Sequence, residues 1–234
     1  MQLDFHYYCV AVLARAAGFK SQDALDIAYA SQYVDNATET GRVELEFPTN
    51  GGPPDRTMRF DQVRTAYWGL EVLHTVTWDA QKRVWIPFHF IPPSRFDPDN
   101  PTDFSFVTVK NSDFAEDLLD QAAAEPLENH RRRLCRIGVA LHTYADYWSH
   151  ADFSGREEKS ENDVEGIHIW NKEAGEYDHL KIENVLFDAL PFIGHGEAGY
   201  FPDLAFARWK FSVTSSPDEL ERENPVRFLE AAEE

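Results

Sequence analysis

Apolar residues return every three or four positions along several segments of the chain, which is the spacing of a helix that buries one face. Residues 22–34 show this pattern after Ser21, a residue type that caps helix N-termini. A helix is also predicted over 7–17, because this stretch has no breaker and ends before Gly18. Three further helices are predicted: after the N-cap Ser112 to about 124, from 127 to about 151, and from 225 onward.

Residues 36–93 depart from the helical pattern. The sequence Gly51-Gly52-Pro53-Pro54 marks a loop, and 43–47 alternates apolar and polar residues as a short strand does. Prolines predict an extended conformation over 84–93, whereas 62–73 leans helical. Further along, 155–175 is polar and predicted to be loop, and 180–193 is predicted to hold a helix interrupted at Pro191.

These elements predict a mainly α, all-alpha type of fold. We expect one domain over 1–234, a helical bundle with a small β-hairpin or extended insertion around residues 43–90. An acidic C-terminal tail is expected at about 215–234.

Charge limits the partners that the chain can bind. The net charge is −19, from 22 basic and 41 acidic residues. Such a surface repels long nucleic acid and anionic membranes, so a small substrate is expected and stable membrane association is not. The sequence has neither a long apolar run nor a secretory signal, so a cytoplasmic protein is expected.

The predicted helix 127–151 carries the most specific chemical pattern. His142, Asp146 and His150 are spaced four apart, as H-x3-D-x3-H, so they form one stripe along a helix. Two imidazoles and a carboxylate suit divalent transition metals, zinc first among them. The alternative is an amphipathic helix whose polar stripe hydrogen-bonds to its neighbours.

This motif, followed by Ala151-Asp152-Phe153, resembles the helix signature of zinc-dependent phospholipases C and the related single-strand-specific nucleases. Those enzymes usually have H-x3-D-x5-H, and some bacterial members resemble the present spacing more closely. The family also has a metal-binding His in a His-Phe step before an Asp-Pro-Asp turn, which His89-Phe90 and Asp97-Pro98-Asp99 match. Similar uncharacterised bacterial chains combine an opening DFHYY, a QYVD and a late GH…PD, and the present chain has all three, which contain His6, Asp35 and His195.

The resemblance implies a cluster of two or three Zn2+ ions and assigns a ligand set to each. The first ion would be held by Asp35, His89, His142 and Asp146. The second would be held by His150 and His195 with one more carboxylate. The third would be held by His6 and Asp146, with the chain's N-terminal amine or Asp4 as a further ligand.

The family pattern leaves one ligand undetermined. The family's last His is followed four residues on by Glu or Asp, but the present chain has Gly199 there. Glu197, Asp203 or the pair His179 and Glu183 must then supply the carboxylate.

The function implied by the resemblance is hydrolysis of a phosphodiester or phosphomonoester by a metal-activated water. Asp4 or Asp152 would orient that water as a general base. Two alternatives are kept: a non-catalytic metal-binding structural or sensing domain, and a helical phosphohydrolase with an adjacent His-Asp pair. The latter is disfavoured because this chain has no such pair in that order.

Overall fold

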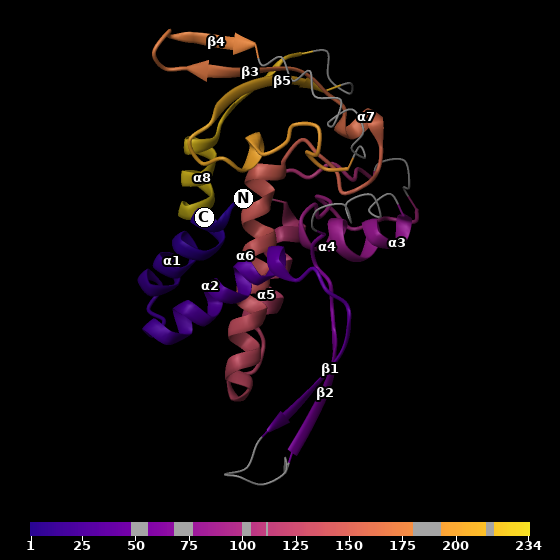
Figure 1. Ribbon diagram of the computed structural model, residues 1–234, viewed down its shortest axis with the longest axis vertical. Helices are drawn as coiled ribbons and strands as arrows, with labels where there is room; N and C mark the ends of the chain where they lie inside the picture. The colour runs from indigo at the N-terminus through magenta and orange to yellow at the C-terminus, as the bar shows by residue number, and fades with distance from the viewer. Residues whose placement is uncertain (48–55, 68–76, 100–103, 111, 180–192, 214–217) are drawn as a thin grey trace.

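The computed structural model describes residues 1–47, 56–67, 77–99, 104–110, 112–179, 193–213 and 218–234 (Figure 1). Within these ranges helices account for 48% of residues and strands for 21%, and the strands form two antiparallel sheets. The chain therefore has a mixed α/β fold, and the predictions of a mainly α fold and of an all-alpha protein were wrong.

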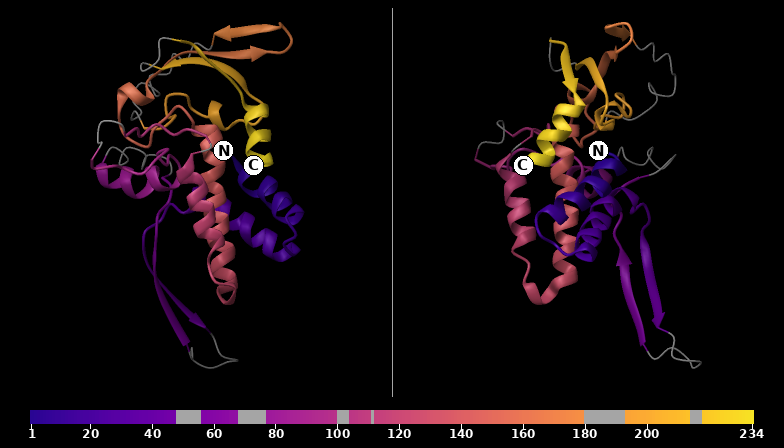
Figure 2. Two further views of the ribbon diagram at one scale, coloured as in Figure 1. Left: turned by 180° about the vertical axis from the view of Figure 1, so that it is seen from behind. Right: turned by 90° about the vertical axis from the view of Figure 1, so that its left-hand side faces the viewer.

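The long helix α6, His130–His150, runs through the centre of the molecule (Figure 1). A 3-10 turn, Leu127–Asn129, leads into it, so the helix predicted over 127–151 is confirmed apart from its first turn. Helix α5, Asp113–Ala123, lies alongside it (Figure 2). The predicted cap is confirmed, because Ser112 Oγ accepts a hydrogen bond from the Ala115 N–H at 3.2 Å.

Helix α2, Ser21–Asn36, packs closely across α6. The approach depends on Gly138 of α6, where a Cβ atom would collide with the Ile27 carbonyl oxygen and the Ala30 side chain. Before α2 the chain forms a π-helical turn, Asp4–Cys9, which continues as α1, Val10–Ala16. The two helices predicted in this region are confirmed, and they bring the N-terminus against α6.

The C-terminal segment packs into the core. Helix α8, Asn224–Glu233, confirms the helix predicted from 225 onward. Its Phe228 meets Phe5 edge to face, with ring centroids 5.7 Å apart, and both lie in the cluster of buried side chains that contains Tyr147 and Trp148 of α6. This cluster fixes the N-terminal turn and α8 beside the last two turns of α6.

A four-stranded antiparallel sheet covers the end of α6 (Figure 1). Its strands are β3 Val164–Asn171, β4 Glu176–His179, β5 Arg208–Val213 and β6 Leu220–Glu223, in the order β4-β3-β5-β6. Trp209 and Phe211 of β5 stack on each other, and Phe211 stacks on Phe153 just after α6. The prediction of loop over 155–175 was therefore wrong. Residues 164–171 of this region form β3, which pairs with β5, a strand whose buried and half-buried residues alternate. The short helix α7, Lys159–Asn162, precedes β3.

The predicted hairpin is present as β1, Gly41–Phe47, and β2, Arg56–Gln62, which project away from the body (Figure 2). Residues 63–67 are not helical, and the rest of the helix predicted over 62–73 falls mostly outside the described residues, as does that over 180–193. None of the helices in the described ranges combines the length and apolar character that a membrane crossing requires.

The extended conformation predicted for 84–93 was wrong over its first half. This part of the chain forms α3 Trp78–Ala80, a π-helical turn Gln81–Trp85 and α4 Ile86–Phe88. Pro87 lies inside this helical run, just after the change from the π-helical turn to α4, the kind of irregularity at which a proline and its kink are accommodated. The helical run ends at His89, which the turn directs toward α6.

Candidate metal centre

The last two turns of α6 carry the predicted stripe. His142, Asp146 and His150 are only 0%, 1% and 4% exposed. Asp146 Oδ2 lies 3.4 Å from His142 Nε2 and 3.5 Å from His150 Nδ1. The stripe therefore faces the interior, and three groups of ligand-type side chains are arranged along it.

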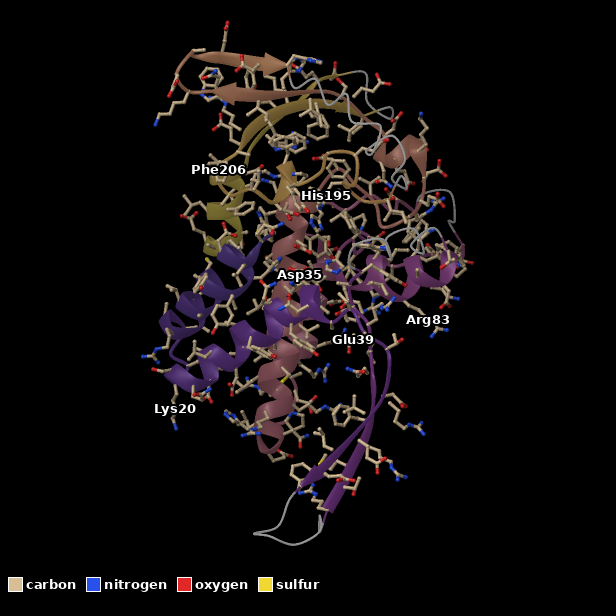
Figure 3. The ribbon with its side chains drawn as sticks, viewed as in Figure 1. Lys20, Asp35, Glu39, Arg83, His195 and Phe206 are labelled. Carbon is tan, nitrogen blue, oxygen red and sulfur yellow. The ribbon has the colours of Figure 1, made fainter. Side chains whose placement is uncertain are left out.

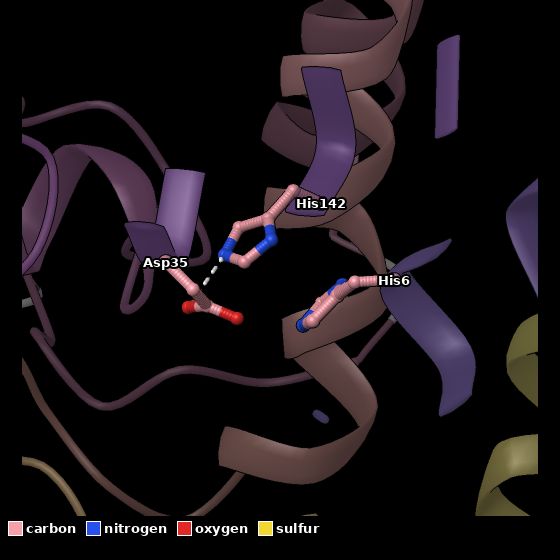
Figure 4. A group of neighbouring side chains, drawn as sticks. All are labelled: His6, Asp35 and His142. Atoms are coloured by element: carbon pink, nitrogen blue, oxygen red, sulfur yellow. Dashed lines mark ion pairs between the residues drawn. The ribbon is translucent and has the colours of Figure 1, made fainter. Parts of the chain in front are cut away.

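The first group consists of His6, Asp35 and His142 (Figure 4). His142 Nε2 lies 3.6 Å from Asp35 Oδ1, and the imidazoles of His6 and His142 stack with centroids 3.9 Å apart. The three side chains come from the N-terminal turn, the end of α2 and α6. Each offers a ligand atom within 4.8 Å of the others.

The second group consists of His89, His142 and Asp146. His89 Nδ1 lies 3.2 Å from Asp146 Oδ2 and 3.3 Å from His142 Nε2. The other ring nitrogen of His89, Nε2, donates to the Thr65 carbonyl oxygen at 2.9 Å. In the neutral imidazole this bond leaves the lone pair on Nδ1, which is the nitrogen that faces the cluster.

The third group consists of His150, His195 and Asp203. The Nε2 atoms of the two histidines are 3.1 Å apart, and Asp203 Oδ1 lies 3.2 Å from His150 Nε2. His150 Nδ1 donates to the His89 carbonyl oxygen and His195 Nδ1 to the Gly199 carbonyl oxygen. Both Nε2 atoms therefore point their lone pairs toward the same place.

The Met1 amine lies between the groups. It is 2.7 Å from Asp146 Oδ1, 3.0 Å from Asp203 Oδ1 and 3.1 Å from Ser149 Oγ. Burial by itself lowers the pKa of this amine, but attraction to Asp146, Asp203 and Asp35 outweighs burial and raises the pKa to about 11. The ammonium group stays charged and neutralises part of the carboxylate charge.

The protonation states of the cluster suit a metal ion. Burial, reinforced by repulsion from His142, lowers the pKa of His6 to about 4, and burial lowers that of His195 to about 4. Burial raises the pKa of Asp146 and of Asp203, but the nearby histidines and the Met1 amine outweigh it, so both pKa values lie well below the usual range. At neutral pH His6 and His195 are thus neutral and Asp146 and Asp203 are ionised, the forms that bind metals. Burial lowers the pKa of His89, but the hydrogen bond and charge of Asp146 outweigh it and raise that pKa.

A cavity of about 500 Å³ opens onto the cluster. Asp35, His89, Asp146, His195 and Asp203 all contribute to its wall. Aromatic side chains line it as well, and none of its described lining residues is Lys or Arg. The aromatic residues are Tyr67, Trp85 and Tyr200.

Three of the candidate residues lie outside the groups. Asp4 is exposed and accepts a hydrogen bond from the Phe5 N–H. Asp152 forms an ion pair with Arg222 at 2.6 Å. Glu197 accepts from the Val164 N–H of β3 at 2.9 Å. Asp203 is therefore the carboxylate that joins His150 and His195, and Glu183 lies outside the described residues.

Two groups that contact the cluster could not be predicted from the sequence. The Thr65 backbone orients His89, and the Ser149 hydroxyl contacts the Met1 amine. Ser149 lies next to His150 in the motif, but residue spacing does not show that it faces the amine. Thr65 acts through its carbonyl group, which every residue type has.

The groups in the described part of the chain can thus hold a metal ion. No curated protein and no solved structure matches the chain significantly. One family model matches residues 1–234, and the chain therefore belongs to DUF6765, a family of unknown function.

Proposed function

We propose that this protein is a metal-dependent phosphoesterase that hydrolyses small phosphodiesters or phosphomonoesters with two or three zinc ions. The observation that carries the proposal is the continuous set of three ligand groups along one wall of a cavity. The resemblance of the ordered histidines and aspartates to zinc-dependent phospholipases C and single-strand-specific nucleases supports the same reaction class.

The contacts within the cluster fit metal ions better than they fit a hydrogen-bond network. Ligand atoms about 2.0–2.1 Å from a tetrahedral zinc lie roughly 3.4 Å from each other. The nitrogen–nitrogen distances of 3.1 Å between His150 and His195 and 3.3 Å between His89 and His142 are close to this value.

His6 supports the same interpretation. Neither of its ring nitrogens has a hydrogen-bond partner among the residues that the structure describes, although Nε2 lies 3.1 Å from Asp146 Oδ1. Buried polar atoms are nearly always satisfied. A metal ion would satisfy this one. Asp146, whose two oxygens lie 3.1 Å from His6 Nε2 and 3.2 Å from His89 Nδ1, would be shared between two ions.

Bound divalent ions lower the pKa of a water to about 7 and neutralise charge on a phosphoryl group. The protein contributes the arrangement of the site. Thr65 and the His89 carbonyl fix the rings of His89 and His150 through the nitrogens that face away from the cluster. Asp35 (labelled in Figure 3) is the most exposed residue of the three groups, with a side chain 32% accessible, and it lines the cavity.

One observation favours a second candidate function, a non-catalytic metal-binding domain. The group of His89, His142 and Asp146 is almost completely buried, as expected for an ion with a purely structural role. An ion there would stabilise the fold without meeting a substrate.

The test is hydrolysis of bis(4-nitrophenyl) phosphate and 4-nitrophenyl phosphate by zinc-loaded protein, with metal content measured by mass spectrometry. Asp146→Asn should lower turnover on the order of 100-fold or more and reduce bound zinc. Asp117→Asn is the matched control, since Asp117 is exposed and pairs with Arg95. Absence of turnover by zinc-loaded wild type on both substrates would refute the phosphoesterase, and stable zinc binding in that case would favour the second function.

A further inference from the structure

The hairpin of β1 and β2 has one apolar face. Residues that lie directly opposite each other on antiparallel strands point to the same side of the sheet. The register pairs Val43 with Phe60 and Leu45 with Met58, and the next pair toward the tip adds Phe47. We call these side chains the apolar hairpin face, and its members are Val43, Leu45, Phe47, Met58 and Phe60.

The other face of the hairpin is polar, and its charges are neutralised across the strands. Arg42 Nε lies 3.0 Å from Asp61 Oδ1, and Arg59 Nη2 lies 3.0 Å from Glu44 Oε1. Both pairs are directly opposite each other in the register. This face is therefore suited to water, and the hairpin as a whole is amphipathic.

The apolar hairpin face is also open to water. Phe47 is 39% exposed, Met58 41%, and Leu45 and Phe60 44% each. No other helix or strand of the described chain packs extensively against β1 or β2, and the hairpin projects from the body (Figures 1 and 2). A two-stranded hairpin is only marginally stable by itself in water, and a contiguous exposed apolar patch marks a surface that another molecule covers.

The two ends of the apolar hairpin face carry opposite charges. At the tip end Arg56 lies opposite Phe47, with its guanidinium carbon 5.4 Å from the centre of that ring, and its Nη2 donates to Met58 Sδ at 3.4 Å. At the base Glu39 is exposed, two residues before β1 begins (Figure 3). Neither Arg56 nor Glu39 forms an ion pair within the part of the chain that the structure describes. The face is thus positive at its tip and negative at its base.

A second copy of the chain fits these features. Two hairpins that lie face to face and antiparallel, related by a two-fold axis, would cover each other's apolar side chains as the sheets of a sandwich do. Val43 is midway along the strand between Glu39 and Phe47. A two-fold axis close to Val43 would therefore bring Arg56 of each copy to Glu39 of the other.

The projection of the hairpin keeps the two bodies apart in such a pair. Seven residues of an antiparallel strand span roughly 23 Å, so the bodies would lie at opposite ends of the joined hairpins. This separation exceeds the Debye length of about 8 Å at physiological ionic strength. The repulsion between two chains of net charge −19 is therefore largely screened.

We propose that the apolar hairpin face is a self-association surface, through which two copies of this protein form a symmetric antiparallel dimer. Arg56 of each copy pairs with Glu39 of the other. A membrane suits the face less well, because docking on anionic lipid uses clusters of Lys and Arg, whereas Arg56 is the one cation that the described hairpin presents there. The dimer is independent of the proposed function, since none of the three ligand groups lies on the hairpin.

Sedimentation velocity of the full chain tests the dimer. The few side chains of the face are far fewer than the roughly 20–30 residues a side of a standard interface, so we expect a dissociation constant of roughly 10 µM. The concentration series should extend about thirtyfold above that value. Leu45→Ser and Phe60→Ser should each weaken the dimer about tenfold or more, because less apolar surface is buried.

Glu46→Gln is the matched control for these two variants. Glu46 is exposed and lies on the polar face, opposite Thr57, so its replacement should leave the dissociation constant within about twofold. All three positions are solvent-exposed, and unchanged zinc content and thermal unfolding would show that each variant folds.

Charge reversal tests the antiparallel arrangement. Arg56→Glu and Glu39→Arg should each weaken the dimer at least about threefold, because each places like charges together at both ends of the interface. The double variant restores opposite charges and should recover most of the lost affinity. A double variant that is no better than the single ones would refute the pairing of Arg56 with Glu39.

Two further results would overturn the self-association surface. One is a wild-type protein that stays monomeric at the highest concentration, or that dimerises equally well after Leu45→Ser and Phe60→Ser. The other is a monomeric wild type that binds phosphatidylcholine vesicles and loses this binding in Phe60→Ser, which would assign the face to a membrane instead.

Discussion

Asp203 Oδ1 lies 3.2 Å from His150 Nε2, and Asp203 Oδ2 lies 3.4 Å from His195 Nε2. One carboxylate thus connects a histidine of the central helix with a histidine of a late loop. The 3-10 turn Phe201–Asp203 directs the side chain inward. Glu197, the rival candidate, faces Val164 instead.

Replacing Asp203 should therefore remove one metal ion. We expect Asp203→Asn to lose about one zinc per chain, because an amide is a poorer ligand than a carboxylate. Glu197→Gln should keep the wild-type zinc content. Elemental analysis of both variants after dialysis measures this, and loss of zinc from Glu197→Gln alone would show that the carboxylates have been assigned wrongly.

Gly194 positions His195 in the third group. Its φ is +55°, and a Cβ atom would collide with the ring of Phe90, which itself stacks on His150. We expect Gly194→Ala to destabilise the fold by roughly 2–4 kcal/mol, from overpacking and backbone strain together, and to weaken zinc binding.

Gly175→Ala is the control for this substitution. Gly175 also has a positive φ, +71°, but has open space where a Cβ would be. Only the strain should remain there, about 1 kcal/mol, with zinc binding unchanged. Chemical denaturation and zinc titration of the two variants give the comparison, and equal effects would mean that contact with Phe90 is unimportant.

Asp152 lies two residues after His150 yet faces another part of the molecule. It has a φ of +85° and pairs with Arg222 beside a separate cavity. Asp152→Asn should keep zinc content and turnover within about twofold and cost no more than about 1 kcal/mol of stability, since asparagine tolerates this conformation and the pair is partly exposed. A large loss of turnover at full zinc content would restore Asp152 as a candidate general base.

The sequence could predict the centre of the site because α6 is regular. A spacing of four residues puts His142, Asp146 and His150 on one face whatever surrounds them. The order of His6, Asp35, His89 and His195 along the chain, read beside a known family, indicated which other residues would join them.

The remaining ligand of the third group and the four-stranded sheet could not be predicted, because they depend on tertiary contacts. Choosing Asp203 over Glu197 required the direction of a loop, and no spacing rule gives that. The sheet was missed because β3 and β4 carry polar residues at exposed positions, and because β3 is held by pairing with β5, whose Trp209 and Phe211 are buried in the core. Pro87 was misleading for a local reason, since it lies inside a helical run, just after the change from the π-helical turn to α4, and does not keep the chain extended.

The stability of the metal-free protein should depend on pH in both directions. His6 and His195 have pKa values lowered from 6.5 to about 4, chiefly by burial, so the unfolded chain binds more protons between these limits. Their contribution to stability is present above pH 6.5 and is lost as the pH falls toward 4. The Met1 amine, raised from 8.0 to about 11, contributes fully below pH 8.0 and loses its contribution as the pH rises through 11.

His89, whose pKa is raised by Asp146, acts in the opposite sense to His6 and His195, because its contribution is lost as the pH rises above 6.5. The expected result is that the metal-free protein is most stable near neutral pH and less stable at both more acid and more basic pH. Urea denaturation in a chelator at about pH 5, 7 and 9.5 measures the free energy of unfolding on both sides of neutral pH. His195→Gln should reduce the change in the free energy of unfolding between pH 5 and 7, because glutamine does not titrate. His130→Gln, at an exposed position, should leave that change as it is in wild type. If the wild-type protein unfolds at the same urea concentration at pH 5 and at pH 7, these buried histidines do not become charged when the chain unfolds.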